Sequence, residues 1–219
     1  HSTFYFNPSP VLTLPLRLIV CVVLFTSTIN AAETPVDFEN DIIAIFTKSG
    51  CNAGACHGAA IGRGGFKLSL YGGNPAADYN AIVHQLQGRR INRASPSESL
   101  LLLKPTEHVA HEGGTLFDME SAEAELFRTW ISQGAKKTRF HDLVAIELSP
   151  DRIYTDDVNT AHSIRVTAVY KDGSTRDVTK WSVLQPEDTS AVELHEGNSG
   201  FTIQRRGRQI VTIRYLTKV

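Results

Sequence analysis

The spacing of apolar residues changes near residue 140, and this change limits the folds open to the chain more than any other feature. Between about residues 35 and 135, apolar side chains recur at the intervals of amphipathic helices. After Lys136 and Lys137 they alternate with polar ones, as in strands that bury one face. The pattern therefore predicts a helical part followed by a β part.

Start and stop signals divide the first part into separate helices. Each predicted helix ends before a glycine or a proline, and each begins at a capping or helix-starting residue: Asp37, Asn74-Pro75, Ser95-Pro96 and Ser121. Gly-rich loops at 58–65 and 113–114 separate them. We therefore expect an all-α region in which Gly-rich loops connect the helices.

The second part contains short alternating runs separated by turns. Lys171-Asp172-Gly173-Ser174 is a hairpin signal. The predicted strands are 143–148, 163–170, 181–184, 191–194, 201–204 and 209–216. This arrangement predicts a β-sandwich, with a core formed by Val166, Ala168, Trp181, Val192, Ile203 and Ile213.

The N-terminal segment has the pattern of a secretory signal peptide. Arg17 precedes the apolar run 18–25, and small residues lead to Ala31-Ala32. We expect residues 1–32 to be a signal-peptide region cleaved near Ala32, and the mature protein to be periplasmic, in the cell envelope or secreted. A membrane anchor is the alternative, but the run is short for a span, and no later run reaches spanning length.

Composition excludes one broad class of partner. The 219 residues include 22 lysines and arginines against 23 aspartates and glutamates, a formal net charge of −1. A chain without excess cations is a poor general nucleic-acid binder, because that binding depends on displacing phosphate counterions. We therefore expect no nucleic-acid partner.

The segment 49–58 carries the chemistry of the chain. It contains two thiols, Cys51 and Cys56, and the adjacent imidazole of His57. Covalent haem attachment needs two thiols for the vinyl groups and a histidine for the iron, and its usual spacing is Cys-x-x-Cys-His. Here the spacer has four residues, but residues 53–55 are small enough to loop outward. We therefore expect haem c on Cys51 and Cys56, with His57 as an iron ligand.

Three other interpretations of this segment stay open. The two thiols can form a local disulfide in an exported protein. They can bind zinc with His57, although no second cluster completes a four-ligand site. His57 can also be a structural histidine.

The sixth position of the iron has three candidate ligands. We favour His111, then Met119, then His108, because this region follows the third predicted helix and can fold back over the ring. Arg89-Arg90 can pair with haem propionates, and the alternative for this pair is a solvated helix end. We find no nucleophile–base–acid set that would form an active site, so the sequence does not predict an enzyme.

Several segments of the first part resemble the planctomycete-type cytochrome c module. They are 36–38, 51–58, 65–70, 99–105 and 130–135, and the resemblance covers about residues 35–137. It implies an all-α cytochrome c-like haem domain at 33–138. In related modules a Met-Pro-Pro-Gly-like loop supplies the distal ligand. In this chain the segment 110–114 stands at the corresponding position, and it contains His111, which supports His111 as the distal ligand.

Segments 166–170 and 172–179 resemble the bacterial Ig-like group 2 family. This resemblance implies an all-β Ig-like sandwich at 143–219 that acts as a spacer or docks an envelope or surface partner. In proteins of this arrangement further domains usually follow, and any enzymatic role would lie there.

The sequence as a whole thus predicts an exported multidomain chain, in which an all-α cytochrome c-like domain precedes an all-β Ig-like sandwich. Its predicted function is one-electron transfer to or from a redox partner protein, without enzymatic activity. One alternative is a non-redox envelope or adhesion protein with a Cys51–Cys56 disulfide. Another is a sensor in which an open haem site binds a gas.

Overall fold

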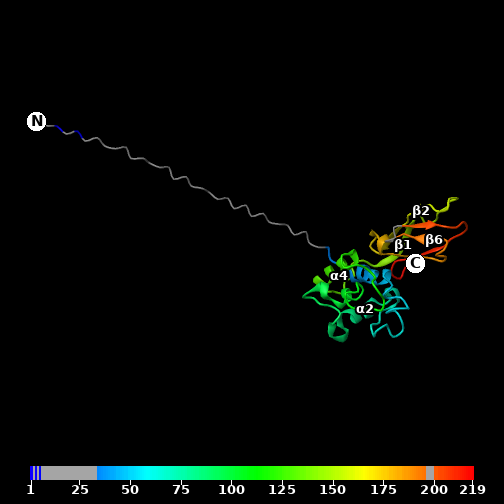
Figure 1. Cartoon of the computed structure of the whole chain (residues 1–219), viewed down its shortest axis with the longest axis horizontal. Coiled ribbons are helices and arrows are strands. Elements are labelled where there is room, and N and C mark those ends of the chain that lie inside the picture. Colours follow the sequence, from blue (N-terminus) through cyan, green and yellow to red (C-terminus); the bar gives the residue numbers. More distant parts are fainter. Residues whose placement is uncertain (2, 4, 6–33, 196–199) are drawn as a thin grey trace. The chain divides into compact units, whose positions relative to one another are not determined.

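The computed structural model describes residues 1, 3, 5, 34–195 and 200–219. The predicted signal peptide and its cleavage point at Ala32 lie outside the described residues, apart from positions 1, 3 and 5. Within the described part, residues Thr34–Val219 form one compact unit (Figure 1). No helix in that part is long and apolar enough to cross a membrane.

The predicted capping residues do start helices. Asp37 accepts hydrogen bonds from the backbone N–H groups of Glu39 and Asn40, and Ser121 accepts one from Ala124. The helical elements are η1 (Phe38–Ile42), α1 (Ile43–Lys48), η2 (Leu70–Gly72), α2 (Pro75–Tyr79), η3 (Asn80–His84), η4 (Gln85–Gly88), η5 (Pro96–Glu98), α3 (Leu100–Leu103), α4 (Ala122–Ser132) and η6 (Thr179–Trp181). Here η denotes 3-10 or π turns, so much of the helical part consists of single turns rather than long helices.

The β part consists of short antiparallel ladders. Its strands are β1 (Leu143–Ser149), β2 (Ala161–His162), β3 (Arg165–Tyr170), β4 (Thr175–Asp177), β5 (Val183–Pro186), β6 (Val192–Leu194), β7 (Phe201–Ile203) and β8 (Val211–Arg214). They pair in the orders β1-β3-β4, β2-β7-β6 and β5-β8. The predicted hairpin is confirmed, because Val169 pairs with Thr175 across the turn between β3 and β4.

The predicted fold class is wrong. The described residues form a mixed structure with four short α-helices and three small antiparallel sheets, 26% helical and 19% strand, and not an all-α cytochrome domain plus an Ig sandwich. The physical reason lies in element length. Gly-rich loops separate mostly short helical elements in the first part, and strands of two to seven residues divide among three sheets in the second.

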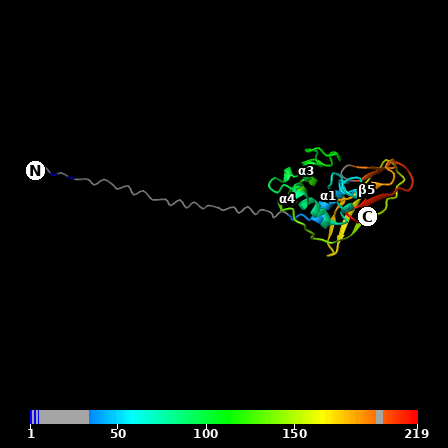
Figure 2. The same ribbon diagram turned by 90° about the horizontal axis from the view of Figure 1, so that it is seen from below.

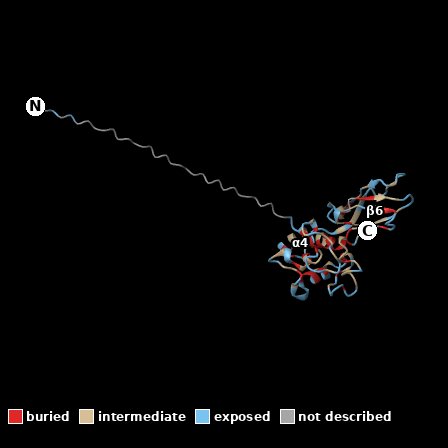
Figure 3. Ribbon diagram, in the orientation of Figure 1, coloured by how far each residue is buried: buried red, intermediate tan, exposed pale blue. Residues whose placement is uncertain are grey.

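Helical and β elements share one buried core. Phe38, Phe127 and Trp130 from the first part and Val166, Ala168 and Tyr215 from the second are at most 1% exposed and belong to one cluster. Figure 3 shows buried residues in both parts, and Figure 2 shows α1 between α4 and β5.

Polar contacts also cross between the two parts. An Arg176 Nη1–Asp41 Oδ1 ion pair of 2.7 Å joins β4 to η1, and the Tyr215 hydroxyl donates to the Asn40 carbonyl at 2.7 Å. The predicted division into a domain at 33–138 and a domain at 143–219 stays a prediction, which the unfolding experiment in the Discussion tests.

Candidate functional site

The loop after α1 holds Cys51, Cys56 and His57 in a closed turn. The backbone N–H of His57 donates to the Cys51 carbonyl at 2.9 Å, and the backbone N–H of Cys56 donates to the Ala53 carbonyl at 3.0 Å. A Cβ on Gly58 would lie 2.3 Å from the Asn52 carbonyl oxygen, so the loop closes only with glycine there. The four-residue spacer therefore folds back on itself and keeps both cysteines beside the histidine.

Two backbone carbonyls determine which nitrogen of His57 is free. His57 Nδ1 lies 3.1 Å from the Arg63 oxygen and 2.9 Å from the Phe66 oxygen. Carbonyl oxygens only accept, so Nδ1 carries the proton and Nε2 keeps its lone pair. Burial lowers the pKa of His57 and outweighs the two carbonyls, which raise it. A neutral imidazole whose other nitrogen is held by a carbonyl is the usual form of a metal-binding histidine.

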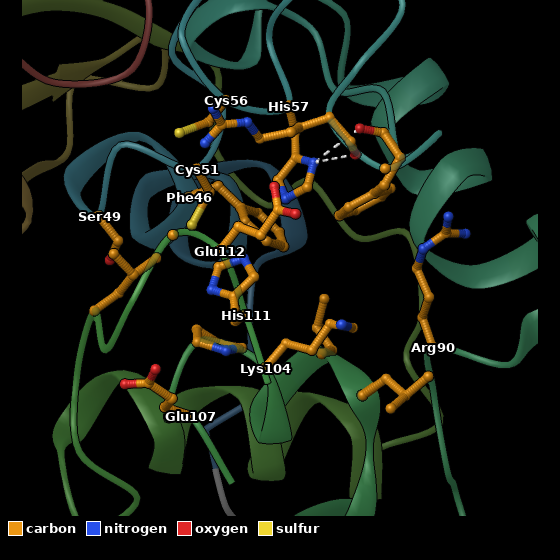
Figure 4. Close-up of a pocket in the computed structure, with 18 of the residues that line it drawn as sticks. Phe46, Ser49, Cys51, Cys56, His57, Arg90, Lys104, Glu107, His111 and Glu112 are labelled. Atoms are coloured by element: carbon orange, nitrogen blue, oxygen red, sulfur yellow. Dashed lines mark hydrogen bonds between the residues drawn. The ribbon is translucent and has the colours of Figure 1, made fainter. Parts of the chain in front are cut away.

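His111 has the same arrangement. Its Nδ1 lies 3.2 Å from the Gly114 carbonyl oxygen, which only accepts, so the neutral ring has its proton on Nδ1 and its lone pair on Nε2. The ring centroids of His57 and His111 are 6.3 Å apart, and their planes differ by 17° (Figure 4). Two imidazoles that bind one metal ion from opposite sides, each about 2 Å from it, have centroids about 6 Å apart.

Both cysteines are free thiols and partly buried. Cys51 packs against the hydrophobic core. Burial raises the pKa of its thiol to about 12, and the nearby Cys56 raises it further. Cys51 therefore stays protonated at neutral pH in the folded chain.

All four predicted site residues line one cavity of about 840 Å³. Such a volume lies in the range of cofactor sites, about 300–1,000 Å³. The rest of the lining includes an apolar group formed by Phe46, Phe66, Leu86, Leu100, Leu101 and Leu116. The site therefore combines apolar walls with a few convergent polar groups.

Cations exceed anions in the wall of this cavity. Arg63, Arg89, Arg90 and Lys104 line it, against Glu107 and Glu112. Arg90 is buried, and its guanidinium carbon lies 4.3 Å from the centroid of the Phe66 ring. The cavity is therefore suited to a ligand with an apolar body and negative groups.

Among the three candidates for the sixth ligand, only His111 lines this cavity. Met119 does not, and its carbonyl accepts a hydrogen bond from Arg128 at 2.8 Å. His108 is exposed, with Nδ1 3.0 Å from the Thr106 hydroxyl. The loop geometry thus separates three residues that sequence order alone left as competitors.

Sequence reasoning missed Leu86, Lys104, Glu107 and Glu112 as wall residues. Leu86 carries one weak signal, because it and Gln87 precede Gly88, and all three have positive φ. A bulky residue with positive φ is a feature of functional sites, but φ is not readable from sequence. The remaining three lie in or beside a loop whose path depends on tertiary contacts.

Comparison with known protein families and curated sequences found no match. No protein-family model matches the chain, and no curated protein sequence matches it. In the part of the chain that the structure describes, no group of three or more His, Cys, Asp or Glu side chains is arranged to hold a bare metal ion.

The donor set of the cavity fits a haem. A haem iron takes four nitrogens from its own ring, so the protein supplies only one or two axial ligands. The His57 and His111 rings have centroids 6.3 Å apart, and the two thiols share their cavity. The cations of the wall match the carboxylates that haem carries.

Proposed function

We propose that this chain is an exported electron-transfer protein with one covalently attached haem. Cys51 and Cys56 would hold the haem, and His57 and His111 would bind its iron. The supporting observation is that two thiols and two histidines line one cavity, with imidazole centroids 6.3 Å apart. The haem supplies the redox couple of its iron, and the protein supplies ligands, burial and orientation.

Attachment requires only the atoms of thiol and vinyl groups. Each cysteine sulfur would hold the haem through a thioether bond to one vinyl carbon, with the thiol hydrogen on the other vinyl carbon. No oxidant or reductant is consumed in this addition. The closed 51–58 turn keeps the two sulfurs on one side of the cavity (Figure 4).

Backbone carbonyls of the protein orient the two histidines before the haem binds. The Arg63 and Phe66 carbonyls hold the His57 ring and fix its tautomer. The Gly114 carbonyl does the same for His111. Two imidazole ligands give a lower reduction potential than a His/Met pair, because methionine raises it. A redox partner protein and the exported location belong to the same proposal.

Production of the full chain with a cytochrome c maturation system tests the proposal. We expect haem that stays with the chain on a denaturing gel, and a mass increase of one haem. Cys51→Ser and Cys56→Ser should each keep at most one thioether, and the double variant should lose covalent haem. His108→Ala, outside the cavity, is the matched control and should attach haem normally.

The opposite outcome is equally distinct. A colourless matured chain with a mass two hydrogens below that of the reduced protein would contradict the proposal. It would indicate the Cys51–Cys56 disulfide of a non-redox envelope protein.

A further inference from the structure

Arg90 is a buried cation that has no charged partner among the described residues. It is 9% exposed, and none of the ion pairs among the described residues includes it. Burial lowers its pKa, and the neighbouring Arg89 lowers it further. Burying an unpaired charge is costly, so such a residue beside a cavity points to an anionic ligand.

The side chain of Arg90 is fixed in place by contacts that leave most of its donors free. Its Nη1 donates to the Ala81 carbonyl at 2.8 Å, the one hydrogen bond its side chain makes in the described structure. A guanidinium has five N–H donors. The Phe66 ring contacts both Arg90 and His57, with centroid distances of 4.3 Å to the guanidinium carbon and 4.8 Å to the imidazole. Arg90, Phe66 and His57 therefore form a continuous wall.

The position of Arg90 relative to the thiols matches the chemical layout of a haem. In Figure 4 the two cysteines lie on one side of His57, and Arg90 lies on the other. Haem carries its vinyl groups toward one edge and its two propionates at the opposite edge. With the vinyl groups at the thiols, the propionates would lie toward Arg90.

We propose that Arg90 binds a carboxylate of the molecule that occupies this cavity, on the side opposite Cys51 and Cys56. This inference rests on the proposed function, under which the carboxylate is a haem propionate. Arg90 is then a positioning residue, which orients the ring so that both vinyl groups reach the thiols. Arg89 and Lys104 also line the cavity, and their positive charges add to the attraction that Arg90 exerts on a carboxylate.

Titration of the unmatured full chain under reducing conditions tests this role. The probes are hemin, which has two free carboxylates, and hemin dimethyl ester, in which both are neutral. We expect the free acid to bind about tenfold or more tightly than the ester, since a charge-assisted contact has this size. The measurement is the Soret band as a function of probe concentration.

Arg90 variants then assign the preference to this residue. Arg90→Gln should bind acid and ester equally, while Arg90→Lys should keep part of the preference because it keeps the charge. Arg93→Gln is the matched control, since Arg93 is exposed and does not line the cavity. It should bind like the unaltered chain.

Two failures are distinguishable. Equal binding of acid and ester by the unaltered chain would overturn the role of Arg90 and leave haem binding intact, and this comparison needs no variant to fold. Absence of a Soret shift with either probe would contradict the proposed function and the inference together.

Discussion

At the scale of single residues, backbone carbonyls decide what the histidines of the cavity can do. Nδ1 of His57 and Nδ1 of His111 each lie within hydrogen-bond distance of a carbonyl oxygen, so the neutral form of each ring has its lone pair on Nε2. In the described residues, only carbonyl oxygens contact these two Nδ1 atoms. Ring orientation therefore follows from the path of the two loops, and small backbone changes should move the two imidazoles.

Gly113 provides a direct test of this dependence. A Cβ at this position would lie 2.7 Å from Cε1 of His111, so Gly113→Ala must displace the imidazole. We expect the visible spectrum of the matured variant to resemble that of His111→Ala, with the low-spin bands reduced. His108→Ala should leave the spectrum unchanged, and an unaltered spectrum in Gly113→Ala would remove His111 as a ligand.

Cys51 should react slowly in the folded chain. Its pKa of about 12 leaves only a small thiolate fraction at pH 8, and the thiolate is the nucleophile. We expect iodoacetamide to alkylate Cys51 at least tenfold more slowly in the folded unmatured chain than in the denatured chain. Peptide mass spectrometry measures both rates. Equal rates would show that Cys51 is accessible and ionised, and a need for reductant would indicate a disulfide.

Part of the site was predictable from sequence because its chemistry is local. The Cys56-His57 adjacency and the spacing to Cys51 are covalent facts of the chain. His111 was one of three candidates, and the structure alone puts it on the cavity. Lys104 and Glu112 were not predictable, because the direction of a loop side chain depends on distant contacts.

At the scale of elements, the 51–58 loop depends on one close backbone approach. A Cβ on Gly58 would lie 2.3 Å from the Asn52 oxygen and 2.8 Å from the Ala53 oxygen. Gly58→Ala should therefore open the loop and lower the free energy of unfolding by about 1–3 kcal/mol. Urea unfolding measures the change.

Gly54→Ala is the matched control in the same loop. Its Cβ would make only an ordinary contact of 3.9 Å with Leu70. We expect nearly unchanged stability and normal haem attachment in this variant. Equal stability of the Gly58 and Gly54 variants would contradict the role given to the closed turn.

Element starts were more predictable than element pairing. Caps act within a turn of chain, so Ser121 and Asn74 correctly placed the starts of α4 and α2. The strand runs were also close to β1, β3 and β7. Which strands pair depends on contacts between distant segments, and the short β2 left no alternation to read.

At the scale of the whole molecule, the fold class was mispredicted because each part was interpreted alone. The buried residues of both parts form one cluster, and the Arg176–Asp41 pair and Tyr215 join the β part to η1. Alternation in a sequence shows that a strand has a buried face, but not what covers it. Here the buried residues of the strands belong to the same cluster as those of the helices.

This shared core predicts a single unfolding transition. In a urea series followed by hydrogen exchange and mass spectrometry, peptides from α4 and β3 should lose protection at the same concentration. Two separate transitions would support independent domains at 33–138 and 143–219 and contradict the shared core.

Arg176→Met should shift that common transition to lower urea. The Asp41 side chain is only 14% exposed and would lose its partner. Since the Arg176 side chain is 38% exposed, we expect a loss of about 1–3 kcal/mol, below the value for a fully buried pair. Arg165→Met is the control, because its contact with Asp177 is exposed. A larger loss in the control would contradict the assignment.

Electron paramagnetic resonance of the matured, oxidised full chain tests the central claim most directly. If His57 and His111 both bind a haem iron with their ring planes 17° apart, a rhombic low-spin ferric signal is expected, because nearly parallel imidazoles split the iron orbitals unequally. His111→Ala should convert it to a high-spin signal, and His108→Ala should not. A chain without any haem signal, or one that is high-spin before mutation, would contradict the account.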